Sequence, residues 1–340
     1  MKINELSKNI DNQRIDPVYL VQGNDQYLQE KVEKALLSII PDDQRIMNVG
    51  ILDFEQTTMS NILNEVESAP FFGERRLVIV RNAKFLTGER LKQKVDLDGL
   101  VNYLNHPEPT TVMVILAPYA KLDGRKKIVK DLKTKATLIN TDSPSENEVR
   151  GYVNSDIEHN GYQIDNNGMN LLISRTDANL ATIMNELPKL YLYGVDSKMI
   201  TEQAVSELVP QSLNQNVFDL INALLNSNIK KALDIYADLM VLQEQPLRIN
   251  AALLSQFRLL IQSKILSERG FSQGKVAEEL KVHPYRVKLA LQTSRRFNLE
   301  RLEAGYLGLV DIEHQLKSTT RDPQGLFELF LVKFNNKKKI

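Results

Sequence analysis

The segment from residue 17 to residue 31 has the layout of a phosphate-binding loop but lacks the side chains that would hold a phosphate. A Walker A loop, G-x-x-x-x-G-K-[ST], lies between a strand and a helix. Its amides surround the phosphates, its Lys reaches the terminal phosphates and its hydroxyl binds Mg²⁺. If Gly23 is the first glycine, the other three positions hold Leu28, Gln29 and Glu30. A carboxylate in place of the metal-binding hydroxyl would repel a triphosphate. The sequence therefore indicates a nucleotide-binding fold that no longer binds a nucleotide.

Two interpretations of this loop remain open. Gly23-Asn24-Asp25 reads as an ordinary turn, because Asn and Asp accept hydrogen bonds from the first free amides of a helix. Lys31 lies close enough in sequence to allow weak anion binding, so a divergent NTPase is an alternative. The residues favour the capped turn.

The other catalytic positions of such a fold are also empty. A Walker B motif needs Asp-Glu after an apolar strand, to order Mg²⁺ and polarise the attacking water. After Leu77–Val80 the chain has Arg81-Asn82, and the apolar run 112–116 ends in Ala117-Pro118. Neither end offers a group to act on a terminal phosphate, so we expect no nucleotide hydrolysis.

No other catalytic or metal-binding pattern is visible. The histidines are far apart and lack metal-ligand spacing: His106, His159, His283 and His314. No Ser-His-Asp or paired-carboxylate arrangement can be identified from the order of residues. We expect no catalytic residues, no metal and no cofactor.

The composition is that of an ordinary globular protein. Of 340 residues, 42% are hydrophobic and 25% charged. Lys plus Arg and Asp plus Glu both number 43, so no overall field draws the chain to nucleic acid or to an anionic membrane. The absence of cysteine excludes disulfides and thiol catalysis and fits a reducing compartment. The start lacks the apolar core of a signal peptide, and the apolar runs are too short to span a bilayer. We expect a soluble, cytoplasmic protein with no membrane partner.

The first 142 residues alternate short apolar runs with longer amphipathic ones. Continuous β-branched runs are typical of strands buried on both faces. The intervening stretches keep helical spacing, for example at Leu28, Val32, Ala35, Leu36 and Ile39. This alternation predicts an α/β domain with a parallel sheet. The expected strands are 18–21, 49–52, 77–80, 112–116 and 137–139.

The pattern changes at Ser143-Pro144-Ser145-Glu146, which we interpret as a capping box with proline at the first helical position. No strand is expected after it. We predict a small helical domain over residues 143–210, with one helix bent or ended at Pro188. An all-α bundle is predicted over residues 211–340, with a solvated tail at Lys337-Lys338-Lys339.

Phe71 and Phe72 are adjacent aromatic residues between Pro70 and Gly73, ahead of the third expected strand. An exposed pair bounded by Pro and Gly would make a compact anchor, each ring contributing roughly 1.5 to 3 kcal/mol when a partner buries it. The alternative is that both rings cover the sheet, and the usual burial of phenylalanine favours that alternative.

Residues 271–291 resemble a helix-turn-helix, with a turn at Lys281-Val282-His283-Pro284. Between residues 271 and 301 there are seven basic and three acidic residues, a net charge of +4. One alternative is therefore a DNA-binding regulator that uses residues 271–296, with Arg286 and Lys288 in contact with DNA. We favour two bundle helices, because a DNA reader needs a protruding helix. Their expected core residues are Val276, Leu280, Val282, Val287 and Leu291.

Together these segments resemble the delta-subunit family of bacterial DNA polymerase III clamp loaders. The stretches that carry the resemblance are residues 17–23, 69–75, 77–82 and 282–287. The family implies three domains here: an AAA+-like α/β domain with a degenerate nucleotide site over 1–142, a helical lid over 143–210 and a helical collar over 211–340. The resemblance assigns the apparent helix-turn-helix to packing in the collar.

The resemblance implies a non-catalytic subunit that binds and opens the beta sliding clamp for loading on primed DNA. As part of the polymerase III holoenzyme it would be counted with a DNA-directed DNA polymerase, a nucleotidyltransferase. In this family two hydrophobic residues plug a pocket of the clamp, and Phe71 and Phe72 look like that plug, with Arg75 as a further clamp-binding residue. The implied partners are the clamp, primed DNA and, through the collar, the ATP-binding gamma/tau subunits and delta-prime.

Overall fold

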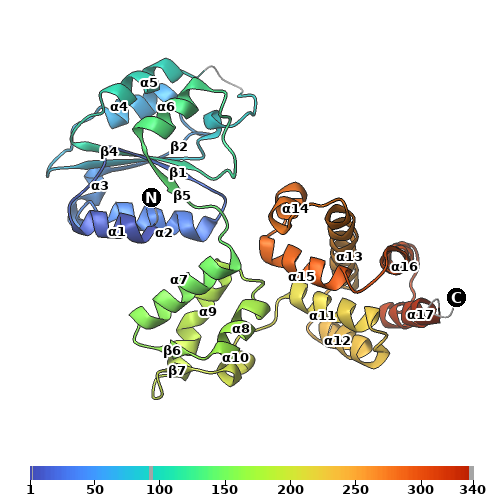
Figure 1. Cartoon of the computed structure of the whole chain (residues 1–340). Helices are drawn as coiled ribbons and strands as arrows, with labels where there is room; N and C mark the ends of the chain where they lie inside the picture. The colour runs from blue at the N-terminus through green and yellow to red at the C-terminus, as the bar shows by residue number, and fades with distance from the viewer. Residues whose placement is uncertain (2, 92–94, 337–340) are drawn as a thin grey trace. The chain divides into compact units, whose positions relative to one another are not determined.

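The computed structural model describes residues 1–336 apart from residue 2 and residues 92–94 (Figure 1). The predicted solvated tail at Lys337-Lys338-Lys339 therefore lies outside the described residues. The chain divides into two compact units, Met1–Pro144 and Ser145–Ile340, and each is described by itself.

A parallel five-stranded sheet forms the centre of the first unit. The strand order is β2-β3-β4-β1-β5, and every neighbouring pair is parallel. This agrees with the predicted fold class, and each predicted strand is found within one or two residues of its expected ends. The strands are β1 (Val18–Gln22), β2 (Val49–Asp53), β3 (Arg76–Arg81), β4 (Thr111–Ala117) and β5 (Thr137–Asn140).

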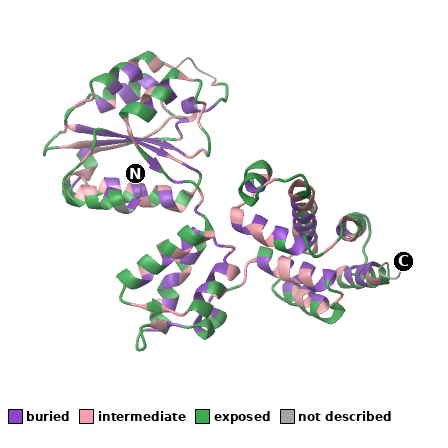
Figure 2. Ribbon diagram, viewed as in Figure 1, coloured by how far each residue is buried: buried purple, intermediate pink, exposed green. Residues whose placement is uncertain are grey.

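Burial separates the central strands from the edge strands (Figure 2). Strands β1, β3 and β4 are almost wholly buried. The prediction of strands buried on both faces was wrong for β2 and β5, where Ile51 and Leu138 are exposed. An edge strand has a neighbour on one side only, and the helices cover the middle of the sheet more completely than its margins.

Helices cover both faces of the sheet (Figure 1). One group is α1, α2 and α3, and the other is α4, α5 and α6, which shares a core with β1, β3 and β4. Helix α1 was not predicted, although its Ile3 and Leu6 are buried. Helix α2 ends before Ile39, which the sequence pattern had placed on it. The bounds are α1 (Ile3–Asp11), α2 (Gln26–Leu37), α3 (Arg45–Asn48), α4 (Met59–Val66), α5 (Leu97–Asn105) and α6 (Lys127–Lys135), with short 3₁₀ turns at Asp42–Gln44 and Lys84–Leu86.

The second unit is mostly helical. Its first part also contains two parallel two-residue strands, β6 (Gln163–Ile164) and β7 (Met199–Ile200), so the prediction of no further strand was wrong. Strands this short leave no periodic pattern in the sequence. The helices are α7 (Glu146–His159), α8 (Asn166–Arg175), α9 (Leu180–Tyr193), α10 (Glu202–Leu208), α11 (Leu213–Leu225), α12 (Ile229–Val241), α13 (Pro246–Glu268), α14 (Gln273–Leu280), α15 (Pro284–Ser294), α16 (Leu299–Ser318) and α17 (Pro323–Asn336).

Helix α9 continues past Pro188 to Tyr193, so the proline does not end it. A proline inside a helix removes one hydrogen bond and costs about 3 kcal/mol. Leu187 and Leu190, on either side of it, are fully buried. Their burial offsets that cost and keeps the helix continuous.

One hydrophobic cluster holds together the helices after residue 211. Helix α13 is central to it and contacts α11, α15 and α16. The cluster runs from Val217 to Phe334 and includes a stacked pair, Tyr236 and Phe327, whose ring centroids are 4.1 Å apart. The predicted boundary near residue 210 stays a prediction, since the compact units divide the chain at 144. Among the described residues, no helix combines the length and the apolar character needed to cross a bilayer.

The capping box lies two residues later than predicted. Ser145 is the N-cap of α7, accepting a hydrogen bond from the Glu148 amide, while the Glu148 carboxylate accepts one from the Ser145 amide at 2.8 Å. Pro144 precedes the cap instead of occupying the first helical position. The sequence contains two overlapping Ser-x-x-Glu matches, and only the second follows the proline.

We therefore expect Ser145→Ala to lower the free energy of unfolding by about 1 kcal/mol, because the amide of Glu148 loses its partner. Ser143→Ala is the matched control and should change it by less than half as much, since the half-buried Ser143 hydroxyl is bonded only to Asn24 in the described structure. Urea denaturation followed by circular dichroism measures both. Equal effects of the two substitutions would contradict the assignment of the N-cap to Ser145 and return Ser143 as a candidate.

Candidate functional site

The three positions that the sequence analysis found without catalytic groups meet at one edge of the sheet. The Gly23 loop, Arg81-Asn82 and the end of β4 all follow parallel strands, so they lie together at the carboxyl edge. They border a hollow of about 470 Å³. Its lining residues are Asn24, Gln26, Gln29, Glu30, Glu33, Arg81, Asn82, Leu116 and Pro118.

The Gly23 loop uses its amides within the protein. The Gly23 N–H donates to Ala117 O at 3.3 Å, and the Asp25 N–H donates to Thr141 O at 2.9 Å. Asp25 is the N-cap of α2 and accepts from the Leu28 N–H at 2.9 Å. The capped-turn interpretation is therefore confirmed. Gly23 is required by close packing, because a Cβ there would lie 2.0 Å from the carbonyl carbon of Thr141.

The charges around this hollow do not suit a triphosphate. Arg81 is paired with Glu33, with 3.3 Å between Nε and Oε2, and hydrogen bonding to that carboxylate raises the pKa of Arg81. Asn82 donates to Asp53 at 2.8 Å, and Glu30 adds a second carboxylate to the lining. Lys31 is not a lining residue, so the NTPase alternative has no lysine at the hollow. Among the residues that the structure describes, no group of three or more His, Cys, Asp or Glu could hold a metal ion.

Phe71 and Phe72 lie at the opposite edge of the sheet. Their loop immediately precedes β3, so it is at the amino edge, whereas the hollow is at the carboxyl edge. The side chains are 74% and 44% exposed, and the rings meet edge to face with centroids 5.8 Å apart. The alternative in which both rings cover the sheet was wrong. Ile62, Leu63 and Val66 of α4 already fill that face.

A buried asparagine fixes the backbone under these rings. The Phe71 N–H donates to Asn48 Oδ1 at 2.8 Å, and Asn48 Nδ2 donates to Phe72 O at 2.6 Å. We call these two bonds the Asn48 bridge; the residue is 0% exposed. Gly73, which follows Phe72, has a positive φ of 83°, and a Cβ there would meet Gln44 Oε1 at 2.3 Å. The rings are thus exposed on a backbone that is held in place.

Arg75 is placed differently from the two rings. It is half-buried, and its charge acts on the phenol of Tyr19. Burial raises the pKa of Tyr19, and the positive charge of Arg75 opposes part of that rise. No cation–π contact joins Arg75 to Phe71 or Phe72 in the described part of the chain. The structure therefore brings the two rings together and leaves Arg75 apart from their contact.

The apparent helix-turn-helix is part of the helical core. Val276, Val287 and Leu291 are buried there, and Leu280 and Val282 pack against the same cluster. The two candidate DNA-contacting side chains have partners within their own unit. Arg286 donates to Gln256 Oε1 at 3.2 Å, and Lys288 donates to Glu146 Oε2 at 2.6 Å.

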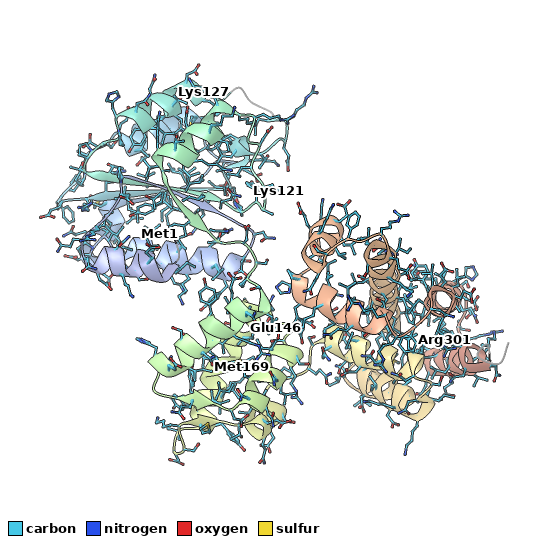
Figure 3. The ribbon with its side chains drawn as sticks, in the orientation of Figure 1. Met1, Lys121, Lys127, Glu146, Met169 and Arg301 are labelled. Atoms are coloured by element: carbon cyan, nitrogen blue, oxygen red, sulfur yellow. The ribbon has the colours of Figure 1, made fainter. Side chains whose placement is uncertain are left out.

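The ion pair at Glu146 links the first helix of the second unit to α15 (Figure 3). Burial alone would raise the pKa of Glu146, but hydrogen bonds from Lys288 and Arg150 outweigh it and hold this pKa below its usual value. Lys288 therefore stabilises a fold contact, which argues against its use as a DNA reader.

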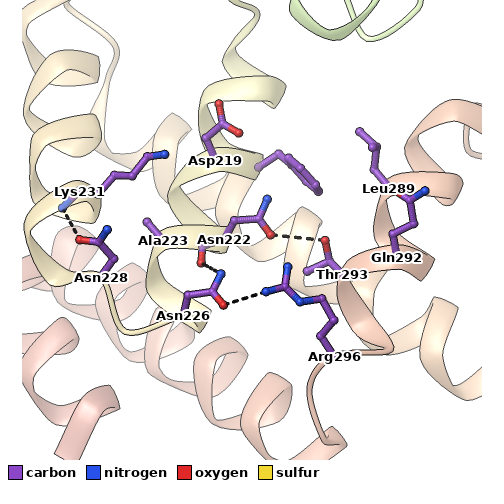
Figure 4. A pocket seen from close by; sticks show the side chains of 11 residues that line it. Asp219, Asn222, Ala223, Asn226, Asn228, Lys231, Leu289, Gln292, Thr293 and Arg296 are labelled. Atoms are coloured by element: carbon purple, nitrogen blue, oxygen red, sulfur yellow. Dashed lines mark hydrogen bonds between the residues drawn. The ribbon is translucent and has the colours of Figure 1, made fainter. Parts of the chain in front are cut away.

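A second hollow, of about 500 Å³, lies between α11, α12 and α15 (Figure 4). Thr293 donates to Asn222 Oδ1 at 3.4 Å and Arg296 donates to Asn226 Oδ1 at 3.2 Å, so polar groups on its wall bond to one another. Burial raises the pKa of Asp219, although Gln211 and Gln215 donate to its carboxylate. These contacts connect helices, and they show no catalytic arrangement.

Comparison with known proteins shows the family of the chain. The family described as "DNA polymerase III, delta subunit" matches residues 19–142, and its C-terminal domain matches residues 214–334. The DNA polymerase III subunit delta of Bacillus subtilis is 36% identical over 328 residues, covering 96% of this chain and 94% of the relative. The chain belongs to the DNA polymerase III delta-subunit family.

Two further delta proteins are similar. A probable DNA polymerase III subunit delta from Aquifex aeolicus is 24% identical over 290 residues, 83% of this chain and 80% of that protein. The structure of the Bacillus subtilis DNA clamp loader delta protein superposes with a TM-score of 0.81 at 34% identity, covering 98% of this chain and 99% of that one. As a member of the delta family, the chain is a clamp-loader component with the fold of that protein.

The occupied amides and the Arg81–Glu33 pair predict that the isolated chain does not bind ATP. Thermal unfolding with and without 1 mM MgATP should give the same midpoint. If the chain had an ATP site, a ligand concentration of 100 times its dissociation constant would raise the free energy of unfolding by about 2.7 kcal/mol. Lys31→Ala serves as the comparison variant. A clear stabilisation by ATP that this substitution removes would support the NTPase alternative and contradict our interpretation of the hollow.

Proposed function

We propose that this chain is the non-catalytic subunit that binds and opens the beta sliding clamp, so that the clamp can be loaded on primed DNA during replication. The observation that carries the proposal is the exposed pair Phe71 and Phe72, fixed by the Asn48 bridge at the edge of the first unit. Membership of the delta family makes a clamp the natural partner.

The physical basis of binding is burial of the two rings. Exposed phenylalanine is unfavourable in water, and each ring contributes roughly 1.5 to 3 kcal/mol when a partner removes it from solvent. Because the rings are 74% and 44% exposed before binding, the pair contributes about 2 to 3.5 kcal/mol, which corresponds to at least about a 20-fold change in affinity. Since the backbone below the rings is already held, little ordering cost reduces this gain.

Clamp opening follows from differential affinity. A ligand shifts an equilibrium between closed and open rings only as far as it binds one form more tightly. In our proposal the plug fits the opened form better, and binding energy at the plug stabilises the strained ring. No chemical step is required of this chain.

The remaining partners belong to the same proposal. The collar, residues 211–340, would assemble with the ATP-binding gamma/tau subunits and delta-prime, whose ATP would control when the plug is exposed. Primed DNA would lie within the assembly, and Arg75 would be a supporting contact of the plug. We place this assembly in the cytoplasm.

The direct test replaces both rings. Phe71→Ala with Phe72→Ala should weaken clamp binding by at least about 20-fold, because the buried apolar area is lost. Equilibrium binding of the full chain to purified clamp measures this loss. Circular dichroism should stay native, since both side chains are exposed.

A matched control uses another adjacent exposed apolar pair. Val241 and Leu242 are 80% and 67% exposed in the second unit, and their double alanine variant should bind the clamp normally. Arg75→Ala should cause a smaller loss than the ring substitutions. Unchanged clamp affinity after removal of both rings would refute the plug.

A further inference from the structure

Two more exposed apolar side chains lie at the amino edge of the sheet. Ile46 and Met47, in the short helix α3, are 89% and 52% exposed. Their segment ends in the residue that makes the Asn48 bridge. An adjacent isoleucine and methionine in water need an explanation, because neither contributes to the core.

The parallel pairing of β2 with β3 places this segment beside the plug. Val49 pairs with Leu77, so the residues just before Val49 and those just before Leu77 lie at the same edge. Three contacts join the two segments. They are the Asn48 bridge, the approach of Gln44 to Gly73, and a hydrogen bond from Arg76 Nη1 to Met47 O at 3.4 Å.

Two arginines beside these segments have acidic partners. Arg45 pairs with Asp42 at 2.6 Å, and Arg76 pairs with Glu65 of α4. The positive charges of these two side chains are therefore compensated locally. This compensation favours an apolar pocket as the partner of the neighbouring apolar side chains.

We propose that the clamp-docking surface is a two-segment patch, made of Ile46 and Met47 from α3 and Phe71 and Phe72 from the loop before β3. Asn48 is its positioning residue, because it carries one segment and holds the backbone of the other. The occupant is the apolar pocket of the sliding clamp, reached as a continuation of the plug. This inference rests on the proposed function.

The Asn48 bridge has a specific role in this surface. In its described bonds to the loop, the Asn48 side chain contacts main-chain atoms only. It therefore sets the position of the rings without touching the partner. Removing it leaves the Phe71 N–H and the Phe72 carbonyl without these partners. The rings then remain present but lose their fixed relation to Ile46 and Met47.

The test compares clamp affinities of full-length variants at equilibrium. Ile46→Ala with Met47→Ala should weaken binding by about 10-fold or more, because two apolar side chains leave the contact. The Val241→Ala with Leu242→Ala variant is the matched control and should not change it. Each variant is also examined for a native circular dichroism spectrum and thermal midpoint.

A double-mutant cycle isolates the positioning role. Asn48→Ala should weaken binding in the parent chain but have no further effect when Phe71 and Phe72 are already alanine, because the bridge acts through the rings. Asn48→Ser keeps a neutral hydroxyl in the buried site but is too short to make both bonds of the bridge, so it should give an intermediate loss. It also provides a second variant if Asn48→Ala does not fold.

The outcomes separate this inference from the proposed function. The two-segment patch is overturned, and the plug left intact, if the Ile46, Met47 variant binds the clamp normally while the Phe71, Phe72 variant does not. Normal affinity of both variants overturns the proposed function as well. Reduced self-association of the chain, measured by sedimentation, with unchanged clamp affinity would make the patch a contact between copies and also overturn the inference.

Discussion

Parallel pairing within the five-stranded sheet is the constraint on which the functional arrangement depends. Because all strands point the same way, the loops that follow them gather at one edge and the segments that precede them gather at the other. The carboxyl edge carries the hollow bordered by the Gly23 loop, and the amino edge carries the exposed rings. Pairing of Val49 with Leu77 then brings α3 next to the plug, although more than twenty residues separate them in sequence. Two surfaces with different chemistry therefore share one rigid support.

In the function that we propose, the first unit acts through its exposed rings and needs no nucleotide at the hollow. The Gly23 loop donates its amides to β4 and to the segment after β5, its Asp25 side chain caps α2, and Arg81 is held by Glu33. In the function that we propose, timing comes from ATP bound to neighbouring subunits, and this chain supplies binding energy. In the same proposal the collar attaches the chain to those subunits. Arg286 and Lys288 are bonded to Gln256 and Glu146 within their own unit.

Much of this could be predicted from the sequence, for identifiable reasons. Continuous apolar runs located the strands, and the missing Lys and carboxylates identified the degenerate loop. The sequence could not decide whether Phe71 and Phe72 were exposed, because that depends on α4 filling the sheet face. Nor could it reveal Asn48, whose hydrogen-bond partners are 23 and 24 residues away. The sequence did not predict the exposure of Ile46 and Met47, because a four-residue helix is too short to show a periodic pattern. Strands β6 and β7 were missed because they are shorter still.

Hydrogen–deuterium exchange of the full chain, with and without purified clamp, tests most directly where the partner docks. Our proposals predict slower exchange in residues 44–48 and 68–76 on clamp binding, with residues 23–30 at the opposite edge unchanged. The Asn48 bridge adds a further expectation: the Phe71 amide, already hydrogen-bonded in the free chain, should exchange slowly even without the clamp. Protection confined to the carboxyl edge or to the second unit, with residues 68–76 unaffected, would contradict a clamp contact through Phe71 and Phe72.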